Sequence, residues 1–335
     1  MNPVDKIIKY FPVDTNSPKK IYIEELDHRT EVYEVKESPL LSSYSAHLYI
    51  IDSKEGREIA CHPHIVGECL SQKCSLLAKD FATILRNIED LSKDTGILHI
   101  LRAGAGYRVH ENIEAPIFRI RTQYREEGYR DHTDNRSINV IYRDYPEKTP
   151  ETLIIPDTCA TGRSSELAIR DLLSQNHYPG KIILYGFIAL PALERISKTC
   201  SRVGINLTSY AICNITQLAY NNYDMAAYGL DESYYNETGA TRKLGSIIAP
   251  ETLRKFIEMY IPGLDQPGDW SERQPKLFNG YTLEQGDVKG HLVKSINLIT
   301  RIREMSRGNE WYFPSMDKAA VTEIEALKKT LRKYQ

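Results

Sequence analysis

The feature that most constrains the fold of this chain is an alternation of short apolar runs with amphipathic helical segments through its middle. The apolar runs, each bounded by turn residues, occupy 96–101, 137–143, 152–156, 181–190 and 205–212. The helical segments SELAIRDLLSQN and PALERISKTCSRVG separate the third run from the fourth and the fourth from the fifth. Continuously apolar strands are typical of a parallel sheet that helices cover on both faces. We therefore expect an α/β fold with a mostly parallel central sheet flanked by helices, whose ligands bind beyond the carboxyl ends of the strands.

The segments on either side of this region differ from it. Residues 1–63 contain alternating runs such as KKIYIEEL and TEVYEV, which indicate a small strand-rich extension. Residues 64–282 hold the α/β domain, which opens with a predicted helix over 64–95. The apolar stripe of that helix is Leu76, Leu77, Phe81, Ile84, Leu85 and Ile88. Residues 283–335 predict a C-terminal helical extension, used for packing or for dimerisation.

The charge balance excludes a global attraction to nucleic acid or to an anionic membrane. The 335 residues include 43 Lys and Arg against 45 Asp and Glu, with a net charge of -2 and no basic stripe. Any anion site must therefore be local, and we expect no nucleic-acid partner. The N-terminus lacks the apolar core of a signal peptide, and no later stretch approaches the roughly 18 apolar residues that span a bilayer. We expect a cytoplasmic protein with no membrane partner.

The sequence CHPHIVGECLSQKC sets His62 and His64 among three cysteines, Cys61, Cys69 and Cys74. These residue types bind metals, but their spacing matches no CxxC knuckle. The chain has only six cysteines, too few for a disulfide scaffold, so reduced thiols are the simpler interpretation. A zinc site and a helix with buried cysteines are the two alternatives, and the spacing favours the helix.

The strongest chemical pattern is TLIIPDTCATGRSSELAIRDLL, in which a buried strand ends at Pro156 and a polar turn leads into a helix. Small residues let the backbone approach a phosphate, while amides, hydroxyls and the helix N-terminus supply donors. This predicted anion cradle consists of Thr158, Ala160, Thr161, Gly162, Arg163, Ser164 and Ser165. Asp157 precedes the cradle and, being an anion, could hold the hydroxyls of a sugar instead. The alternative is an ordinary turn in which a Ser or Thr caps the helix.

A second small-residue turn follows the first apolar run, in the sequence GILHILRAGAGYRV. Arg102 ends the strand, and Ala103 and Gly104 follow it. Glycine permits unusual backbone geometry, and an arginine can donate two hydrogen bonds to one oxyanion. A pyrophosphate would suit both features, whereas the alternative is a plain tight turn.

These two segments resemble the ribose-phosphate and pyrophosphate loops of the type I phosphoribosyltransferases. Pro156 stands where that family has its first acid, and Arg163 where it has a glycine. The segments ILRAG (100–104) and IYRD (141–144) most resemble the corresponding segments of the uracil phosphoribosyltransferases. The run YIPGL at 260–264, with Gly268 and Asp269 after it, resembles the base-binding loop of those enzymes.

The resemblance implies a reaction, ligands and site residues. The chain would transfer ribose 5-phosphate from 5-phosphoribosyl-1-pyrophosphate (PRPP) to a ring nitrogen of a base, with uracil giving UMP and pyrophosphate as the best single expectation. It would bind PRPP through Arg102, Ala103, Gly104, Asp157 and the cradle, with Arg102, Asp157 and Asp269 as catalytic residues. The implied base-binding residues are Tyr260, Ile261, Gly263, Gly268 and Asp269. Mg²⁺ would be held by PRPP, with no direct protein ligand, and family members are commonly homodimers or larger homo-oligomers.

Several points stay open at this level. The insertion QPGDWSERQPK would place Trp270, Glu272 and Arg273 beside the base, so another heterocyclic base is an alternative to uracil. The departures in the phosphate loop leave room for a non-catalytic PRPP-binding regulator. The charged stretch 122–136 is expected to be either a mobile loop or ordinary hydrated surface.

Overall fold

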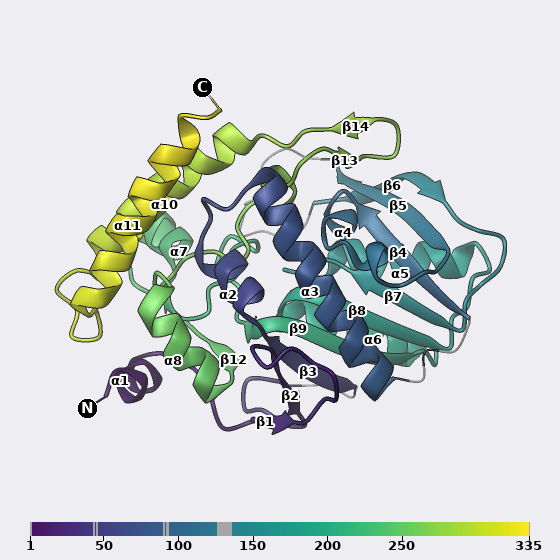
Figure 1. Ribbon diagram of the computed structural model, residues 1–335, viewed down its shortest axis with the longest axis horizontal. Coiled ribbons are helices and arrows are strands. Elements are labelled where there is room, and N and C mark those ends of the chain that lie inside the picture. The colour runs from purple at the N-terminus through teal and green to yellow at the C-terminus, as the bar shows by residue number, and fades with distance from the viewer. Residues whose placement is uncertain are drawn as a thin grey trace.

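The computed structural model describes residues 2–42, 44, 46–89, 91, 94–125 and 136–334, and within them a ten-stranded sheet forms the centre (Figure 1). Nine strands run across it in the order β1 (Pro18–Ile21), β2 (Glu31–Val35), β3 (His47–Asp52), β9 (Asn206–Thr216), β8 (Lys181–Ala189), β7 (Thr152–Pro156), β4 (Thr95–Leu101), β5 (Ile117–Tyr124) and β6 (Ile138–Asp144). The tenth, β12 (Ser246–Ile248), pairs with β9.

The neighbouring strands from β3 to β5 are all parallel, which confirms the predicted fold class. The pairings β1–β2, β2–β3, β5–β6 and β9–β12 are antiparallel. From β4 the chain first adds β5 on one side, and it then adds β7, β8 and β9 on the other side. The direction of strand addition therefore reverses between β4 and β7. In open α/β sheets ligands bind at such a reversal, beyond the carboxyl ends of the strands.

Helices cover both faces of the sheet. One hydrophobic core includes α2 (Lys54–Cys61), α3 (Gly67–Ile88), α8 (Pro250–Met259), α10 (Val288–Ser306) and α11 (Pro314–Leu331). The other core includes α5 (Arg163–Ser174) and α6 (Leu190–Arg202). Side chains alternate along β8, so Tyr185 faces α3 and stacks on Phe81, with ring centroids 3.9 Å apart, while Leu184 joins the core of α5 and α6.

The remaining elements are short. They are α1 (Pro3–Tyr10), α4 (Ala103–Gly106), the 3₁₀ turn η1 (Val109–Glu111), α7 (Glu232–Thr238), α9 (Trp270–Arg273), the pair β10 (Gly229–Leu230) and β11 (Lys243–Leu244), and the pair β13 (Leu277–Phe278) and β14 (Leu283–Glu284). Among the described residues no helix is both long and apolar enough to cross a membrane.

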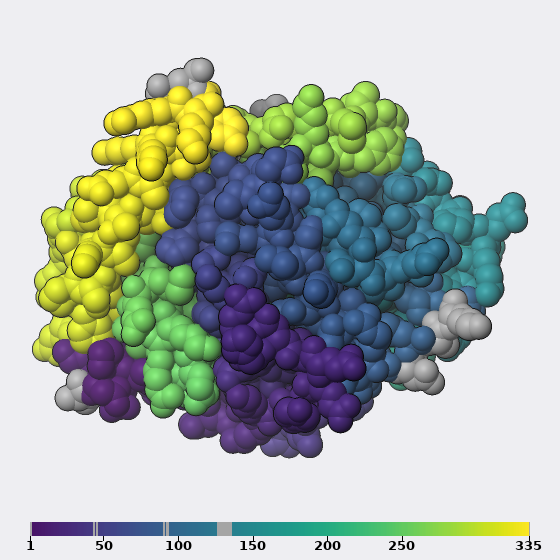
Figure 2. All heavy atoms as spheres, in the orientation of Figure 1, coloured from purple at the N-terminus to yellow at the C-terminus, as the bar shows by residue number. Residues whose placement is uncertain are grey.

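The two ends of the described chain pack together. Figure 2 shows the C-terminal helices in yellow beside purple N-terminal residues and the dark blue surface near α2 and α3. Phe11 meets Trp311 edge to face at 4.8 Å between ring centroids, and Lys6 Nζ donates to the carbonyl of Glu310 at 3.1 Å. The predicted C-terminal helices are confirmed as α10 and α11, which lie side by side (Figure 1).

The five predicted apolar runs are confirmed as β4, β6, β7, β8 and β9. The sequence pattern does not predict β5, because its buried Phe118 and Ile120 alternate with arginines. The predicted stretch 122–136 begins as part of β5, and its residues 126–135 lie outside the described part of the chain.

The remaining sequence-based boundaries need adjustment. The helix predicted over 64–95 is shorter, as α3, and Leu76 of its expected apolar stripe is 53% exposed. The strands β1, β2 and β3 of the N-terminal extension belong to the central sheet, and α1 precedes them.

Candidate functional site

A cavity of about 350 Å³ brings three of the predicted motifs together. Its lining includes Arg102 and Ala103 after β4, Thr158 and Ala160 after β7, and Gly268 and Asp269 of the predicted base loop. The cavity therefore lies where the strand order reverses, beyond the carboxyl ends of β4 and β7.

Direct contacts hold the three motifs in fixed positions relative to one another. The indole Nε1 of Trp270 donates to the carbonyl of Ala103 at 3.0 Å. The Trp270 ring stacks on Tyr107, with centroids 4.4 Å apart, and the Tyr107 hydroxyl lies 2.6 Å from Thr158 Oγ1. Aromatic stacking and buried hydrogen bonds both fix side-chain geometry, so the cavity has a packed wall.

The turn after β4 is crowded against β7. A Cβ on Gly104 would lie 2.8 Å from the carbonyl oxygen of Pro156, so only glycine allows this approach. The Leu101–Arg102 peptide bond is cis. The guanidinium of Arg102 donates to Glu272 at 2.7 Å and lies 3.7 Å from Glu284. Arg102 is thus a largely buried cation at the cavity, held by acids.

The turn after β7 continues the sheet before it enters the helix. The amides of Asp157 and Cys159 donate to carbonyls of β8 at 2.9 and 2.8 Å. Gly162 then adopts a φ of +75° and has no side chain to cap α5, which begins at Arg163, while Thr161 Oγ1 accepts from the Arg163 amide at 3.5 Å. A threonine hydroxyl thus serves one amide at the start of α5, as in the alternative interpretation, and the other amides of the first turn can donate to an anion.

Asp157 is buried, with 4% of its surface exposed, and its carboxylate faces its own turn. One oxygen accepts from the Thr158 amide at 2.9 Å, and the other accepts from Ser165 Oγ at 2.9 Å. Burial raises the pKa of Asp157 to about 6. Ser165 is itself 1% exposed, so its hydroxyl serves the turn; the contact of Asp157 with a sugar stays a prediction.

Two cradle residues face away from this cavity. The Arg163 guanidinium donates to the carbonyl of Arg136 at 2.5 Å and lies 5.8 Å from the ring of Tyr124. Thr161 lines a second cavity, of about 500 Å³, to which Arg195 and Arg242 contribute. The cradle therefore lies between a cavity with Arg102 and a cavity with two further arginines. Ser164 is the second residue of α5 and is half-buried.

The YIPGL run supports the base loop from within. Tyr260 and Ile261 are fully buried, and the Tyr260 hydroxyl donates to the carbonyl of Leu264 and accepts from the Ala227 amide. Gly263 has a φ of +98°, and its amide donates to the carbonyl of Tyr228 at 2.8 Å. Among the predicted base-binding residues Gly268 and Asp269 reach the cavity, and Asp265 of the same loop also lines it.

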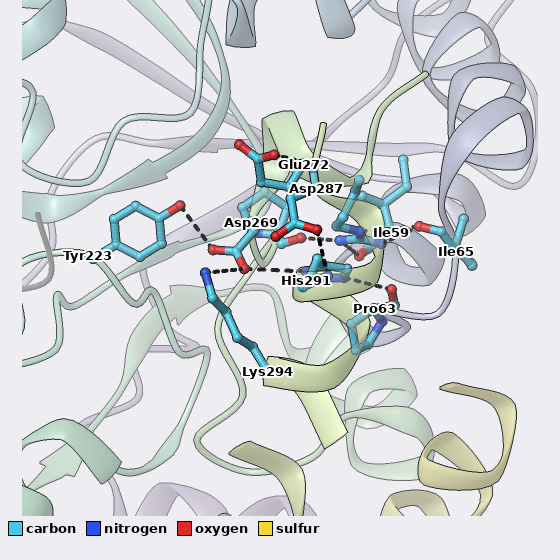
Figure 3. Close-up of polar contacts among 12 residues, drawn as sticks. Ile59, Pro63, Ile65, Tyr223, Asp269, Glu272, Asp287, His291 and Lys294 are labelled. Carbon is cyan, nitrogen blue, oxygen red and sulfur yellow. Dashed lines mark hydrogen bonds and ion pairs between the residues drawn. The ribbon is translucent and has the colours of Figure 1, made fainter. Parts of the chain in front are cut away.

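Asp269 stands at the centre of a polar network (Figure 3). Its carboxylate lies 3.5 Å from the Tyr223 hydroxyl, 3.6 Å from Nδ1 of His291 and 3.7 Å from Nζ of Lys294. His291 and Lys294 come from α10, so this helix sets the position of the base loop. Asp269 also lines a larger cavity, of about 690 Å³, on the side of α10.

The tautomer of His291 follows from its partner. Nε2 lies 2.9 Å from the carbonyl of Pro63, which can only accept, so this nitrogen carries the proton. Burial lowers the pKa of His291, which keeps the ring neutral near pH 7. The nitrogen that faces Asp269 is then unprotonated. A proton between Asp269 and His291 would be held by both groups.

The insertion residues divide between two environments. Trp270 and Glu272 line the cavity, as expected. Arg273 does not: it is 1% exposed and donates to the carbonyls of Ile59, His62 and Ile65 at 3.0–3.2 Å. Contrary to the expectation for Arg273, these carbonyls hold its guanidinium inside the protein and away from the cavity lining.

Sequence reasoning does not identify several residues of the cavity. Arg121 comes from β5, the strand that the pattern does not predict, and Tyr107, just after the small-residue turn, supports the lining from behind through Trp270 and Thr158. The Arg121 guanidinium donates to the carbonyl of Asn279 at 2.9 Å, which ties β5 to the turn between β13 and β14. Tyr223 lies in a polar stretch without a motif, so no local pattern could have marked it.

Comparison with known proteins gives partial structural likeness. No protein-family model matches the chain. No curated protein matches it either. Among solved structures, the AQ2163 protein from Aquifex aeolicus is similar at 20% identity, with a TM-score of 0.40 over 51% of this chain and 86% of that one. Adenine phosphoribosyltransferase from Trypanosoma brucei shares 10% identity, with a TM-score of 0.35 over 53% and 86%. Orotate phosphoribosyltransferase from Aeropyrum pernix shares 16% identity, with a TM-score of 0.28 over 41% and 70%.

Proposed function

We propose that this chain is a PRPP-dependent phosphoribosyltransferase, and that uracil is its acceptor base. The observation that carries the proposal is the convergence of Arg102, Thr158 and Asp269 on one cavity at the point where the strand order reverses. Each of these residues belongs to a different sequence motif, and each motif supplies chemistry for a different part of PRPP and the base.

The pyrophosphate end of PRPP would bind at the turn after β4. Arg102 is a cation at that turn, where it pairs with Glu272 and Glu284, and Arg121 lines the same cavity. A pyrophosphate carries more charge than one carboxylate and offers matched oxygen pairs, so it can replace Glu272 on the guanidinium. The leaving group would then be neutralised as it departs.

The 5-phosphate would bind at the start of α5. Amides from Ala160 to Ser164 and the N-terminus of a 12-residue helix favour an anion there. Arg195 donates to the carbonyl of Thr161 at 2.8 Å, so it steadies this turn and adds positive potential. Asp157 would hold the turn through Ser165, and its contact with the ribose hydroxyls is part of the proposal.

The base would lie at Gly268 and Asp269. In the reaction the ring nitrogen of the base bonds to C1 of the ribose, while the bond from C1 to the pyrophosphate oxygen breaks on the opposite face. Pyrophosphate leaves with the bonding electrons, and the ring nitrogen loses its proton. The Asp269–His291 pair can accept that proton, since the nitrogen of His291 that faces Asp269 is unprotonated.

The residues present fit a Mg²⁺ ion that arrives with PRPP. Mg²⁺ prefers oxygen ligands and keeps several waters, and Asp265, Asp269 and Glu272 present carboxylates at the cavity. When bound, the ion would neutralise charge on the pyrophosphate. The chain's own residues would orient it mainly through water.

One observation favours a second function, a regulator that binds PRPP without turnover. Arg102 is held by Glu272, and both oxygens of Asp157 are already hydrogen-bonded inside the turn. A site with its charged groups internally paired can bind a ligand and still lack a poised reacting group. Uracil and a homodimeric or larger assembly are predictions of the family resemblance alone, and the cytoplasmic location is a prediction from the sequence composition.

The test is a turnover assay with purified protein, PRPP, Mg²⁺ and a panel of bases that includes uracil. We expect UMP and pyrophosphate in equal amounts with uracil, and a fall of about 100-fold or more in kcat/KM for Arg102→Ala. Arg86→Ala, an exposed arginine on α3, is the matched control. A nucleotide formed with another base would identify that base, in place of uracil, as the acceptor. PRPP binding without any product would support the regulator, and neither binding nor product would overturn the proposal.

A further inference from the structure

Two histidines and a buried glutamate meet on the side of α2 and α3 where the C-terminal helix packs. Nδ1 of His62 lies 2.8 Å from one oxygen of Glu323, and Nδ1 of His64 lies 2.7 Å from the other. The three ligand atoms all lie within 4.8 Å of one another. Glu323 belongs to α11 and follows His62 by 261 residues. The sequence pattern does not connect these segments.

The burial of the three side chains differs in a way that matters for metal binding. Only 4% of the Glu323 side chain is exposed, whereas 27% of His62 and 32% of His64 are exposed. The carboxylate therefore anchors the group from inside, and the two imidazoles open to solvent. An ion could reach the group from outside and keep a water in a further position.

The donor set selects among metals. Two imidazole nitrogens and one carboxylate oxygen suit zinc and its neighbours among the divalent transition metals, but not Mg²⁺ or Ca²⁺, which prefer oxygen. Zinc holds such ligands at about 2.0–2.2 Å, which separates neighbouring ligand atoms by roughly 3.3 Å in a tetrahedron. Each imidazole nitrogen lies 2.7–2.8 Å from one oxygen of Glu323, and all three ligand atoms lie within 4.8 Å of one another, so modest side-chain shifts can bring them to these separations.

The thiols of the same segment take no part. Cys61 is fully buried, and burial raises the pKa of its thiol well above the usual range. Cys74 is buried beside Gln274, and Cys69 is exposed on α3. The group of metal-binding residues within the described chain contains none of these cysteines. The zinc alternative in the sequence analysis set the two histidines beside three thiols, and in the structure these thiols lie outside the candidate group.

We propose that His62, His64 and Glu323 form a binding site for Zn²⁺ or a similar divalent transition metal. The backbone that presents the two imidazoles is already fixed. Arg273 donates to the carbonyl of His62, and His291 donates to the carbonyl of Pro63, which lies between the two ligands. A loop held in this way loses little entropy when an ion binds, which favours affinity.

The role of the ion is structural. Two ligands come from the segment after α2 and the third from α11, so the ion joins the C-terminal helix to the body of the protein. Pro63 also lines the 690 Å³ cavity on whose wall Asp269 lies. The site stands behind this wall and is separate from the proposed reaction.

The test uses full-length protein without a histidine tag, stripped with a chelator and titrated with Zn²⁺ in a calorimeter. We expect one ion per chain, a dissociation constant below about 1 μM, and a melting temperature higher by roughly 5 °C in saturating zinc. Co²⁺ in place of Zn²⁺ should give a visible absorption band, which reports ligation in the unaltered chain.

Three variants and two controls make the assignment specific. His62→Gln, His64→Gln and Glu323→Gln should each weaken zinc binding by more than about 100-fold and abolish the Co²⁺ band. Glu325→Gln on the exposed side of α11 and the exposed His28→Gln should leave both unchanged. No zinc binding below about 100 μM in the unaltered chain would overturn the proposal, as would binding that the three variants leave intact.

Discussion

Arg102 and Glu272, 170 residues apart in the sequence, form a 2.7 Å ion pair at the cavity where the predicted pyrophosphate and base loops meet. An anionic ligand at Arg102 must compete with this carboxylate. Glu272→Gln should therefore tighten PRPP binding by about three- to tenfold, because it removes the competing charge and keeps the side-chain shape. Isothermal titration with PRPP measures the change. Glu258→Gln, an exposed glutamate on α8, should have no effect; weaker binding in Glu272→Gln would mean that Glu272 assists the ligand.

Asp157 gives a prediction for stability against pH. Its pKa is raised from the usual 3.8 to about 6 because it is buried, so the folded state binds more protons than the unfolded state between these values. The stabilising contribution is complete below about pH 4 and is lost as pH rises through about 6, by roughly 3 kcal/mol in all. Urea denaturation at a series of pH values measures the loss.

The Asp157→Asn variant tests whether Asp157 causes this pH-dependent loss of stability. The amide oxygen can accept from the Thr158 amide, and Ser165 can accept from the amide nitrogen instead of donating. The variant should lose the fall in stability between pH 4 and pH 6 and be more stable than the parent at pH 8. In the proposed function it should also lower kcat and weaken PRPP binding together. A variant with parental kinetics would contradict the catalytic role of Asp157.

Gly104→Ala should disturb the turn that carries Arg102. The added Cβ would lie 2.8 Å from the Pro156 carbonyl and 3.1 Å from the backbone of His99, so the turn must shift away from β7. We expect a loss of about 1–3 kcal/mol in the free energy of unfolding, together with weaker PRPP binding. Ala105→Ser, in the same turn but partly exposed, should change neither quantity; an unaffected Gly104→Ala would show that the turn can yield without cost.

Arg273 should matter for stability more than its location near the site suggests. Arg273→Met removes the guanidinium that donates to the carbonyls of Ile59, His62 and Ile65, and we expect a loss of more than about 3 kcal/mol. Denaturation midpoints measure it. Arg301→Met, whose partly exposed guanidinium pairs with Glu232, should cost less than about 1 kcal/mol. Equal losses in the two variants would contradict the structural role of Arg273.

Much of the sheet could be predicted because its central strands are buried on both faces and have continuous apolar sequences. β5 could not, since Arg119 and Arg121 interrupt its apolar pattern near the sheet edge. The place of β1, β2 and β3 in the same sheet depends on the parallel pairing of β3 with β9, about 160 residues later in the sequence. Local patterns carry no information about such a pairing.

The candidate site, like the sheet, could be predicted only in part from the sequence. Residues that follow the ends of strands, such as Arg102 and Thr158, could be placed because the carboxyl ends of parallel strands share one edge. The direction of a side chain could not be predicted: Asp157 faces Ser165, and Arg163 faces the base of the β5–β6 hairpin. Glu323 lies on a charged helix with no motif, and only the packing of α11 brings it to His62.

The pairing of Glu323 with His62 and His64 also affects the order in which the chain can fold during its synthesis. At a synthesis rate of roughly 5–20 residues per second, Glu323 leaves the ribosome on the order of 15–50 s after the histidines. During that interval the sheet can assemble, but the surface that α11 covers is open to water and to other chains. A chaperone or a free zinc ion meeting the nascent chain would find the two imidazoles unpaired. The surface that α11 covers is therefore exposed to water until this helix has been synthesised, and the earlier part of the chain must avoid aggregation during that interval.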